Sequence, residues 1–402
     1  MSFKANCRII NKIMKLIYLT SNRLPSKYSS LGKVILEMSR SFTNLLGDDF
    51  LLIVAKAEKP LEDIRYKNLH WPFKRRLSFF YFFWLLGFII KNKRKQLVFL
   101  SLDFYLLAIA GFLKKWFPCK ICSIWTMMYD DWRDYYVSQK SDWLITTSQR
   151  LKDIIAKKTG ANPDKIFVER IGVDTDKFKN FPKNQLRQEL GLPIDKKLIG
   201  YIGSFTAVNH DRELKIMIDI LKFLPQNIMT ILVGAKNNEK NDYEEYAKQK
   251  GTADRFQIFD WQSDEDKVLK FEQVMDILVI PYPNKKHFTD YAFPIKVYEY
   301  MASGAPIIYS DLEIIKEVLE DCAVSFIPEN AYDLAEKITN LLNDENKINY
   351  LTKMAQDKVN NFTWKAQTEK IIEFLKNDES APTQNEQEEV KKRLKSLGYF
   401  DE

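Results

Sequence analysis

The sequence is poor in the side chains that bind metals or carry redox chemistry. Its 402 residues include three histidines and four cysteines, Cys7, Cys119, Cys122 and Cys322. Four scattered cysteines in a chain of this length do not make a disulfide framework, which indicates a reducing compartment. Cys119 and Cys122 form a CxxC pair, but no second pair completes a zinc site. Because this pair opens an apolar stretch, we predict buried strand cysteines and no metal ion.

The sequence also lacks an apolar run long enough to cross a bilayer, and its N-terminus lacks the apolar core of a signal peptide. The most apolar run, 79–90, is far shorter than the roughly 20 residues of a spanning helix. Two interpretations of it stay open: a buried core helix, or a helix lying in one leaflet. Basic runs at 74–76, 91–95 and 114–115 flank apolar stretches of the first half and carry much of the net charge of +7, which makes an anionic membrane surface a candidate partner. Nucleic acid is not expected, because zinc fingers, RNA-binding sheet motifs and long basic helices are absent.

What is present is the composition of a globular protein, with 46% hydrophobic residues, and a length that suggests two domains. Short apolar runs alternate with segments of helical period, which predicts repeated βαβ units. The runs are apolar throughout, as in parallel sheets covered on both faces. They are too many for one open sheet, so we expect two doubly wound, Rossmann-like α/β domains. The expected strands are 16–20, 50–55, 97–102, 121–125, 144–147, 166–168, 198–203, 229–234, 256–259, 277–281, 306–309 and 324–327.

Turn and breaker residues divide the chain. Proline and glycine gather at 181–195, which we interpret as a linker between an N-terminal domain, 1–180, and a C-terminal domain, 196–360. The polar segment 377–402 is expected to be disordered. The clearer helical segments are 33–46, 148–159, 212–224, 296–303 and 331–342.

The turns after the strands are the places to look for a site, because doubly wound sheets bind ligands at the carboxyl ends of their strands. The turn 21–32 is polar and leads into a helix N-terminus, which favours anions. In the turn 203–211, Gly203 lets backbone approach a phosphate closely, and His210 offers a hydrogen bond. Trp261, after a later strand, can stack on a base. The plainer alternative for each is an ordinary surface loop or a half-buried side chain.

The segment 291–306, YAFPIKVYEYMASGAP, carries the strongest signal. Pro294 fits the first turn of a helix, and Gly304 with Pro306 ends it. The helix is therefore expected to begin near residue 295.

Three residues at this helix start suit a nucleoside diphosphate. The free backbone amides near Ile295, the helix dipole and the Lys296 ammonium favour a diphosphate. Glu299 lies one turn further on, where a carboxylate can accept both hydroxyls of a ribose. The alternative is that Lys296 and Glu299 form an ordinary surface pair.

The segment 294–308 resembles the donor-binding signature of the retaining, GT-B-fold group 1 glycosyltransferases. Three further stretches agree with that family in order and spacing. They are 14–27, similar to the opening strand and acceptor-side loop; 143–178, similar to the end of the first domain; and 199–205, similar to the start of the second. The resemblance covers about 14–376. It implies a GT-B fold, with two Rossmann-like domains facing a central cleft and a helix at 361–376 crossing back to the first domain.

The resemblance implies transfer of a sugar from a nucleoside diphosphate sugar, UDP- or GDP-linked, to a lipid-linked, polysaccharide or other glycan acceptor at the cytoplasmic membrane face. It implies retention of configuration and no metal or cofactor beyond the donor, with protein dipoles and cations stabilising the leaving diphosphate. The resemblance implies that Glu299 holds the ribose and that the backbone near Ile295 and Lys296 holds the diphosphate. Taken together with the turns described above, the predicted donor-binding residues are Gly203, Ser204, Phe205, Asn209, Trp261, Tyr291, Phe293, Pro294, Ile295, Lys296 and Glu299. The acceptor-binding residues are Pro25, Ser26, Tyr28 and Ser29. The candidate catalytic residues are Lys296, Glu299, His210 and Asp130.

Three departures from the family pattern matter. Tyr291 stands where many members carry a second glutamate, and Ser204 and Asn209 stand where many carry an Arg and a Lys. The histidine that commonly lies near the reacting sugar is not evident, and Asp130 falls in its region. The candidates for the missing cation are Lys296, Arg212 and Lys285.

Two other functions compete with an active transferase. The departures favour a non-catalytic GT-B binding or scaffold protein that kept part of the donor site. A hydrolysing sugar-nucleotide epimerase shares the fold, but its acid–base chemistry has only three histidines to draw on.

Overall fold

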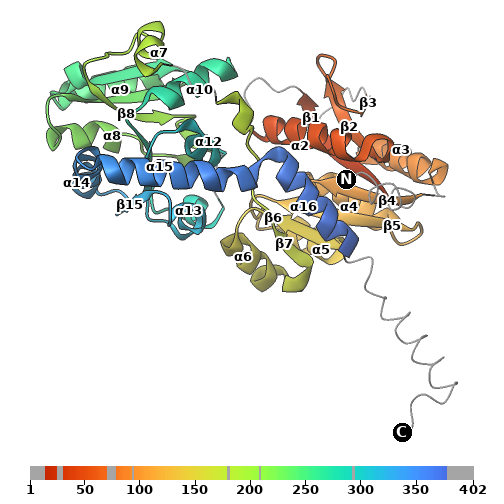
Figure 1. The fold of residues 1–402 in the computed structure, drawn as a ribbon. Coiled ribbons are helices and arrows are strands. Elements are labelled where there is room, and N and C mark those ends of the chain that lie inside the picture. Colours follow the sequence, from red (N-terminus) through yellow and green to blue (C-terminus); the bar gives the residue numbers. More distant parts are fainter. Residues whose placement is uncertain are drawn as a thin grey trace.

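The computed structural model describes residues 14–24, 30–69, 78–92, 95–178, 182–207, 210–291 and 295–377. These residues form two α/β domains that lie side by side, each built on a parallel sheet (Figure 1). The expected pair of Rossmann-like domains is confirmed.

The first domain is built on a seven-stranded sheet in the order β3-β2-β1-β4-β5-β6-β7, and every pairing is parallel. The direction of strand addition reverses between β1 and β4, which is the switch point where doubly wound sheets bind ligands. All six strands expected in this half are present, and the additional β3 is too short and polar to stand out in the sequence. The strands are β1 (Met14–Leu24), β2 (Phe50–Ala57), β3 (Tyr66–Asn68), β4 (Gln96–Ser101), β5 (Cys119–Trp125), β6 (Trp143–Thr146) and β7 (Ile166–Val168).

Helices cover both faces of this sheet. One face packs against α2 and the C-terminal helix α16, and the other against α3, α4, α5 and α6. Cys119 and Cys122 are free and buried in β5, as expected. The helices of this domain are α2 (Ser30–Leu46), α3 (Ser78–Lys91), α4 (Phe104–Leu113), α5 (Trp132–Lys140) and α6 (Gln149–Thr159), with 3-10 turns η1 (Gly47–Asp49), η2 (Pro163–Lys165) and η3 (Thr175–Lys177).

The second domain repeats the plan with a six-stranded parallel sheet in the order β12-β11-β8-β13-β14-β15. Its switch point lies between β8 and β13. All six expected strands are present. They are β8 (Lys197–Ile202), β11 (Ile228–Ala235), β12 (Phe256–Asp260), β13 (Ile277–Ile280), β14 (Ile307–Ser310) and β15 (Val324–Phe326); a separate hairpin joins β9 (Thr206–Ala207) to β10 (His210–Asp211).

Two expectations for the second domain need correction. The helix expected at 212–224 starts later, at Ile216, because Glu213 has a φ of 55° that no α-helix contains. It is also shorter, because a 3-10 turn at Ile220–Lys222 follows it. The stretch expected as a linker, 181–195, contains the helix α7, and Leu186 and Leu190 bury their side chains in the second-domain core.

The helices at 296–303 and 331–342 have the expected bounds. The helices are α7 (Lys183–Glu189), α8 (Ile216–Asp219), α9 (Glu239–Gln249), α10 (Glu265–Val274), α11 (Lys286–Asp290), α12 (Lys296–Ser303), α13 (Glu313–Leu319), α14 (Ala331–Leu342), α15 (Glu345–Val359) and α16 (Trp364–Asn377), with η4 (Ile220–Lys222), η5 (Ala253–Arg255) and η6 (Asn360–Phe362).

The chain passes between the domains twice, and the two passages lie side by side. Val173 N–H donates to the Phe362 carbonyl at 2.9 Å, and Gly172 packs so closely on Trp364 that a Cβ there would lie 2.5 Å from the indole. Beyond this point α16 lies against α2 of the first domain (Figure 1). The two connections between the domains are therefore packed against each other at this point.

Candidate functional site

Two glycines bring the carboxyl ends of β8 and β11 together. Gly234 has a φ of 125°, and a Cβ at this position would lie 2.1 Å from the Gly203 carbonyl oxygen. A Cβ at Gly203 would in turn lie 3.3 Å from Cε of Lys296. The turn after β8 therefore lies directly beside the start of α12, at the switch point of the sheet.

The start of α12 leaves backbone donors without a side-chain cap. Ile295 occupies the N-cap position and its side chain makes no capping hydrogen bond. The helix ends at Gly304, whose φ of 81° is the left-handed conformation that glycine adopts readily. Uncapped amides and the positive end of the helix dipole face the turn after β8, which is the arrangement that suits an anionic ligand.

Glu299 is buried and holds two ammonium groups. Its Oε1 lies 2.8 Å from Nζ of Lys33, and its Oε2 lies 2.9 Å from Nζ of Lys296. Burial raises the pKa of this carboxyl, but the charges of Lys296 and Lys33 outweigh burial and bring the pKa below its usual value. The predicted ribose-binding residue is therefore an ionised carboxylate with both oxygens occupied.

Lys296 is also held by a second carboxylate. Its Nζ lies 2.8 Å from Oε1 of Glu272, which is fully buried on α10. Burial raises the pKa of Glu272 although Lys296 opposes the shift. Lys296 was predicted to bind the diphosphate, and in this structure its ammonium lies between two carboxylates.

Sequence reasoning missed the first-domain member of this cluster, Lys33. It lies in the first turn of α2 and bridges Glu299 and Glu265, with an Nζ–Oε1 distance of 2.5 Å to Glu265. Lys177 binds the other oxygen of Glu265 at 2.9 Å. Burial lowers the pKa of Lys33, but Glu299 and Glu265 raise it by more. One signal was available: a lysine in the first turn of a helix without an acid there opposes the helix dipole.

A second cluster surrounds Arg212. Its Nη1 donates to the hydroxyl oxygens of Tyr201 at 2.5 Å and Tyr282 at 2.6 Å. Nearby, the rings of His210 and His287 stack with centroids 4.5 Å apart. Burial, followed by the charges of His210 and Arg212, lowers the pKa of His287 to about 4, so this imidazole is neutral at physiological pH. His210 therefore lies against a neutral ring on the exposed hairpin, and Arg212 is bound to phenols.

Asp130 lies at the rim between the domains. It pairs with Lys158 of its own domain and lies 3.7 Å from Nζ of Lys286 on α11. The hydrogen bond from Lys158 is the largest influence on its pKa, which is lowered. The structure therefore gives this candidate catalytic residue the character of an ionised, exposed carboxylate. Tyr291 is buried in the hydrophobic cluster of the first domain.

The remaining predicted site residues are Trp261, Phe205 and Ser204, together with seven that lie outside the described ranges. Trp261 follows β12, and Nζ of Lys236 lies 4.1 Å from its ring centroid. Phe205 packs in the core, with its ring 5.1 Å from that of Tyr243, so its side chain is not available to a ligand. The Ser204 carbonyl accepts a hydrogen bond from Tyr201 at 2.9 Å. The predicted residues outside the described part of the chain are Pro25, Ser26, Tyr28, Ser29, Asn209, Phe293 and Pro294.

A second set of polar contacts joins the two domains, apart from the cluster around Glu299. The backbone N–H groups of Gln149 and Arg150 donate to Glu317 at 3.0 and 3.1 Å, so the first turn of α6 is capped by a carboxylate of the other domain. The Arg150 guanidinium also lies 3.0 Å from Asp290. These contacts keep α11 and α13 against the first domain.

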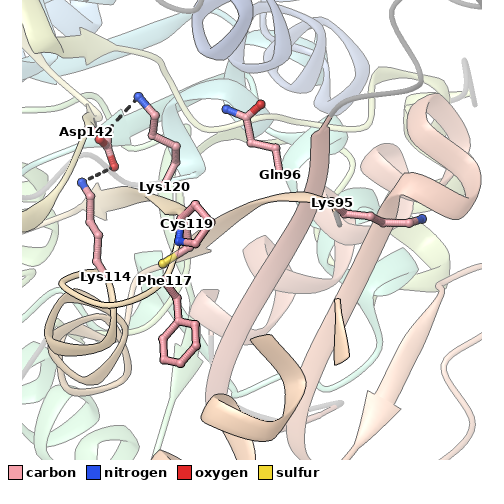
Figure 2. A pocket seen from close by; sticks show the side chains of 8 residues that line it. Lys95, Gln96, Lys114, Phe117, Cys119, Lys120 and Asp142 are labelled. Atoms are coloured by element: carbon pink, nitrogen blue, oxygen red, sulfur yellow. Dashed lines mark hydrogen bonds and ion pairs between the residues drawn. The ribbon is translucent and has the colours of Figure 1, made fainter. Parts of the chain in front are cut away.

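A hollow of about 480 Å³ lies at the opposite edge of the first sheet, where β4 and β5 begin. Lys114 and Lys120 both point at Asp142, with Nζ–O distances of 2.6 and 3.6 Å, whereas Lys95 points away (Figure 2). Because ligands of doubly wound sheets bind at the carboxyl ends, this basic hollow is separate from the site around Glu299.

Comparison with known proteins agrees with this geometry. Residues 182–358 match the model of the family described as "Glycosyl transferases group 1". D-inositol 3-phosphate glycosyltransferase of Corynebacterium aurimucosum is 22% identical over 233 residues, 56% of this chain and 53% of the relative. The enzyme of the same name from Xylanimonas cellulosilytica is 23% identical over 190 residues, 45% of this chain and 43% of the relative. The chain thus spans about half the length of the curated relatives it matches.

Solved structures extend the likeness to both domains. A glycosyltransferase from Rickettsia africae superposes with a TM-score of 0.75 at 18% identity, covering 91% of this chain and 98% of the other. The Anabaena protein HepE, solved in complex with UDP, superposes with a TM-score of 0.73 at 16% identity, covering 90% of this chain and 100% of the other. The fold is GT-B. The family model supports the resemblance to group 1 glycosyltransferases for the domain that carries Glu299.

Proposed function

We propose that this chain is a glycosyltransferase that moves a sugar from a nucleoside diphosphate sugar to a glycan or lipid-linked acceptor. The observation that carries the proposal is Glu299, a buried carboxylate one turn into α12 beside the uncapped helix start. It lies at the switch-point edge of the second sheet and inside the part of the chain that matches the group 1 model. A ribose and a diphosphate need this combination of a buried acceptor and free amide donors.

The proposed donor is a UDP-sugar, with a GDP-sugar as the second choice. The backbone amides at the start of α12 donate hydrogen bonds to the diphosphate. Glu299 accepts hydrogen bonds from the ribose hydroxyls, and Trp261 lies beside the base. The structures of HepE with UDP and with UDP-glucose support a uridine nucleotide, because HepE shares this fold across both domains.

In the proposed reaction the bond between the anomeric carbon and the diphosphate oxygen breaks, and the diphosphate leaves with its electron pair. The acceptor hydroxyl oxygen forms the new bond to the anomeric carbon, and its proton passes to the leaving diphosphate. Retention of configuration and independence of metal are proposed from the resemblance. The negative charge that grows on the leaving diphosphate is stabilised by the α12 dipole and by the lysines near its start.

Thermal unfolding with nucleotides tests the proposal. A ligand that binds only the native protein stabilises it, by about 2.7 kcal/mol at a concentration of 100 Kd. UDP, GDP, ADP and their sugar derivatives are compared at equal concentration, with inorganic diphosphate as the control for charge alone. We expect UDP or GDP to raise Tm and diphosphate to have little effect. No rise in Tm with any nucleotide would contradict a donor site.

The second candidate function is a non-catalytic binding protein, and two observations favour it. Both oxygens of Glu299 are paired with lysines, and Tyr291 is buried in the domain interface. Transfer or hydrolysis of a nucleotide sugar by the purified protein, abolished by Lys296→Ala, would exclude this alternative.

We also propose that the acceptor is reached at the cytoplasmic face of an anionic membrane. Helix α3 buries Tyr81, Leu85 and Ile89 but exposes Phe80 by 65% and Phe83 by 51%. One side of the run 79–90 is therefore core, as the first interpretation expects, and the exposed side supports the proposed membrane contact. No helix in the described ranges is long and apolar enough to cross a membrane.

The charge around this helix supports the same proposal. Between Ile64 and Tyr129 the sequence has twelve Lys and Arg residues and a single acid, Asp103. Trp116, which follows α4, is 60% exposed, and Lys114 beside it lines the hollow of Figure 2. Exposed aromatic rings with a basic surround suit the headgroup region of an anionic bilayer.

A further inference from the structure

The start of α12 needs a cation that is free to meet a diphosphate. The second domain offers three near its switch point, and each is engaged with protein groups. Lys296 lies between Glu272 and Glu299, Arg212 is bound to two tyrosine hydroxyls, and Lys285 pairs with Glu213. A first-domain lysine, Lys33, contacts the carboxylate oxygen of Glu299 that Lys296 does not.

We propose that Lys33 is a donor-site residue contributed by the first domain. When a nucleotide binds, the Lys33 ammonium leaves its ion pair with Glu299 and pairs with the donor diphosphate instead. This inference rests on the proposed function and names one more residue of that site. In the empty protein the Lys33 ammonium occupies Oε1 of Glu299; in the complex the ribose hydroxyls take that oxygen.

The exchange follows from the occupancy of Glu299. Oε1 accepts from Lys33 and Oε2 from Lys296, so two ammonium groups already neutralise one carboxylate. A ribose that binds there displaces one of them. Lys296 lies on the same helix as Glu299, one turn away, and is anchored by the fully buried Glu272, whereas Lys33 comes from another domain. Lys33 is therefore the partner that gives way.

The displaced ammonium has an anion close at hand. The side chain of Lys33 is 30% exposed, and a partly shielded ammonium that loses a partner is destabilised unless another negative charge replaces it. Glu265 still contacts Lys33 but is shared with Lys177. The diphosphate bound at the start of α12 supplies the new charge next to Glu299, and the flexible four-carbon stem of a lysine allows the short movement.

The local sequence of α2 supports the same role. Lys33 lies in the first turn of α2, which contains no acid, so the helix dipole opposes its charge. An anion placed between the starts of α2 and α12 is attracted by both helix dipoles and by Lys33.

Binding of uridine and UDP, measured by calorimetry, tests the inference. The ratio of the uridine Kd to the UDP Kd measures how much the diphosphate contributes to binding. Competition between Lys33 and the ribose for Glu299 affects both ligands, so it does not change this ratio. In Lys33→Ala we expect this ratio to fall about tenfold or more, as the loss of a charge-assisted contact of about 1.4 kcal/mol requires. Uridine itself should bind Lys33→Ala at least as tightly as wild type, because its competitor is gone.

Two variants complete the design. Lys177→Ala removes a lysine that contacts Glu265 but not Glu299, and it should leave the ratio unchanged. Lys33→Arg keeps the charge and should keep most of the ratio, which separates the phosphate contact from a folding defect. A wild-type ratio in a folded Lys33→Ala variant would overturn the inference while leaving the donor site intact. A wild-type protein that binds neither UDP nor uridine, nor GDP nor guanosine, would overturn the proposed function itself.

Discussion

Nζ of Lys33 lies 2.8 Å from Oε1 of Glu299, although 266 positions separate the two residues in the chain. This contact joins the first turn of α2 in one domain to α12 in the other. Because Glu299 is also paired with Lys296, a single buried carboxylate receives an ammonium from each domain. The residue that suits a ribose is thus also a point of contact between the domains.

Replacement of Glu299 by glutamine should weaken UDP binding. The amide keeps the size of the side chain but loses the charge and one acceptor oxygen, so we expect a loss of about 1–3 kcal/mol in binding free energy. Glu272→Gln is the matched control, because Glu272 is as buried and contacts Lys296 but not Lys33. Calorimetry with UDP on both variants measures the difference, and equal losses would contradict a ribose contact at Glu299.

Replacement of Lys296 by methionine should destabilise the fold in a pH-dependent way. Without the ammonium, Glu272 and Glu299 are two buried carboxylates close to each other, and breaking such a cluster costs about 3–5 kcal/mol. Burial already raises the pKa of Glu272, and the loss of Lys296 raises it further, so Glu272 binds its proton as the pH falls. The loss of stability should therefore be larger at pH 8 than at pH 5, measured by urea unfolding. Adding Glu272→Gln should restore part of it, and a pH-independent loss would refute this account.

Gly234 should not tolerate a side chain. In Gly234→Ala the new Cβ meets the backbone oxygen of Gly203 at 2.1 Å, and a positive φ of 125° adds strain. Backbone cannot give way as a side-chain tip can, so we expect a loss of about 2–4 kcal/mol together with weaker UDP binding. Gly87→Ala is the control, because a Cβ there has open space and alanine favours a helix by about 0.5–1 kcal/mol. Chemical denaturation of the two variants gives the comparison.

The parts of the fold that were predicted are those that local pattern determines. In the sequence, a buried parallel strand is a continuous apolar run. The start and the end of a helix such as α12 are indicated by Pro294 and Gly304. The short β3 lacks such a run. The helix expected at 212–224 begins only at Ile216 because Glu213 has a positive φ, which the hydrophobic periodicity cannot show.

The site divides in the same way. Ile295, Lys296 and Glu299 follow from one helix start, and the structure places them together beside Gly203. Lys33 comes from the other domain, and no local pattern encodes a partner 266 positions away. Its pairing depends on how two sheets face each other, which a single sequence does not give.

Glu169 should make stability depend on pH. Burial raises its pKa to about 7, against the opposing charge of Lys370, whose Nζ lies 3.7 Å from Oε1. A carboxyl with a raised folded pKa costs nothing below its unfolded pKa of about 4.5 and costs most above 7, up to about 3 kcal/mol. The unfolding free energy of wild type should therefore fall relative to Glu169→Gln between about pH 4.5 and 7. Urea unfolding of both proteins at pH 5 and pH 8 measures this. A constant difference would show that Glu169 ionises normally in the folded state.

The exposed aromatic side chains of the first domain should bind anionic lipid. Phe83→Ser with Trp116→Ser removes two exposed rings, and we expect this pair to lose most of its flotation with vesicles containing phosphatidylglycerol. Binding of wild type should also weaken as salt rises, because the surrounding lysines act through screened charge. The matched control is Tyr332→Ser with Tyr350→Ser, which removes two rings of similar exposure, 63% and 60%, from helices of the second domain. Equal flotation of both double variants, or equal binding to neutral vesicles, would place the membrane contact elsewhere.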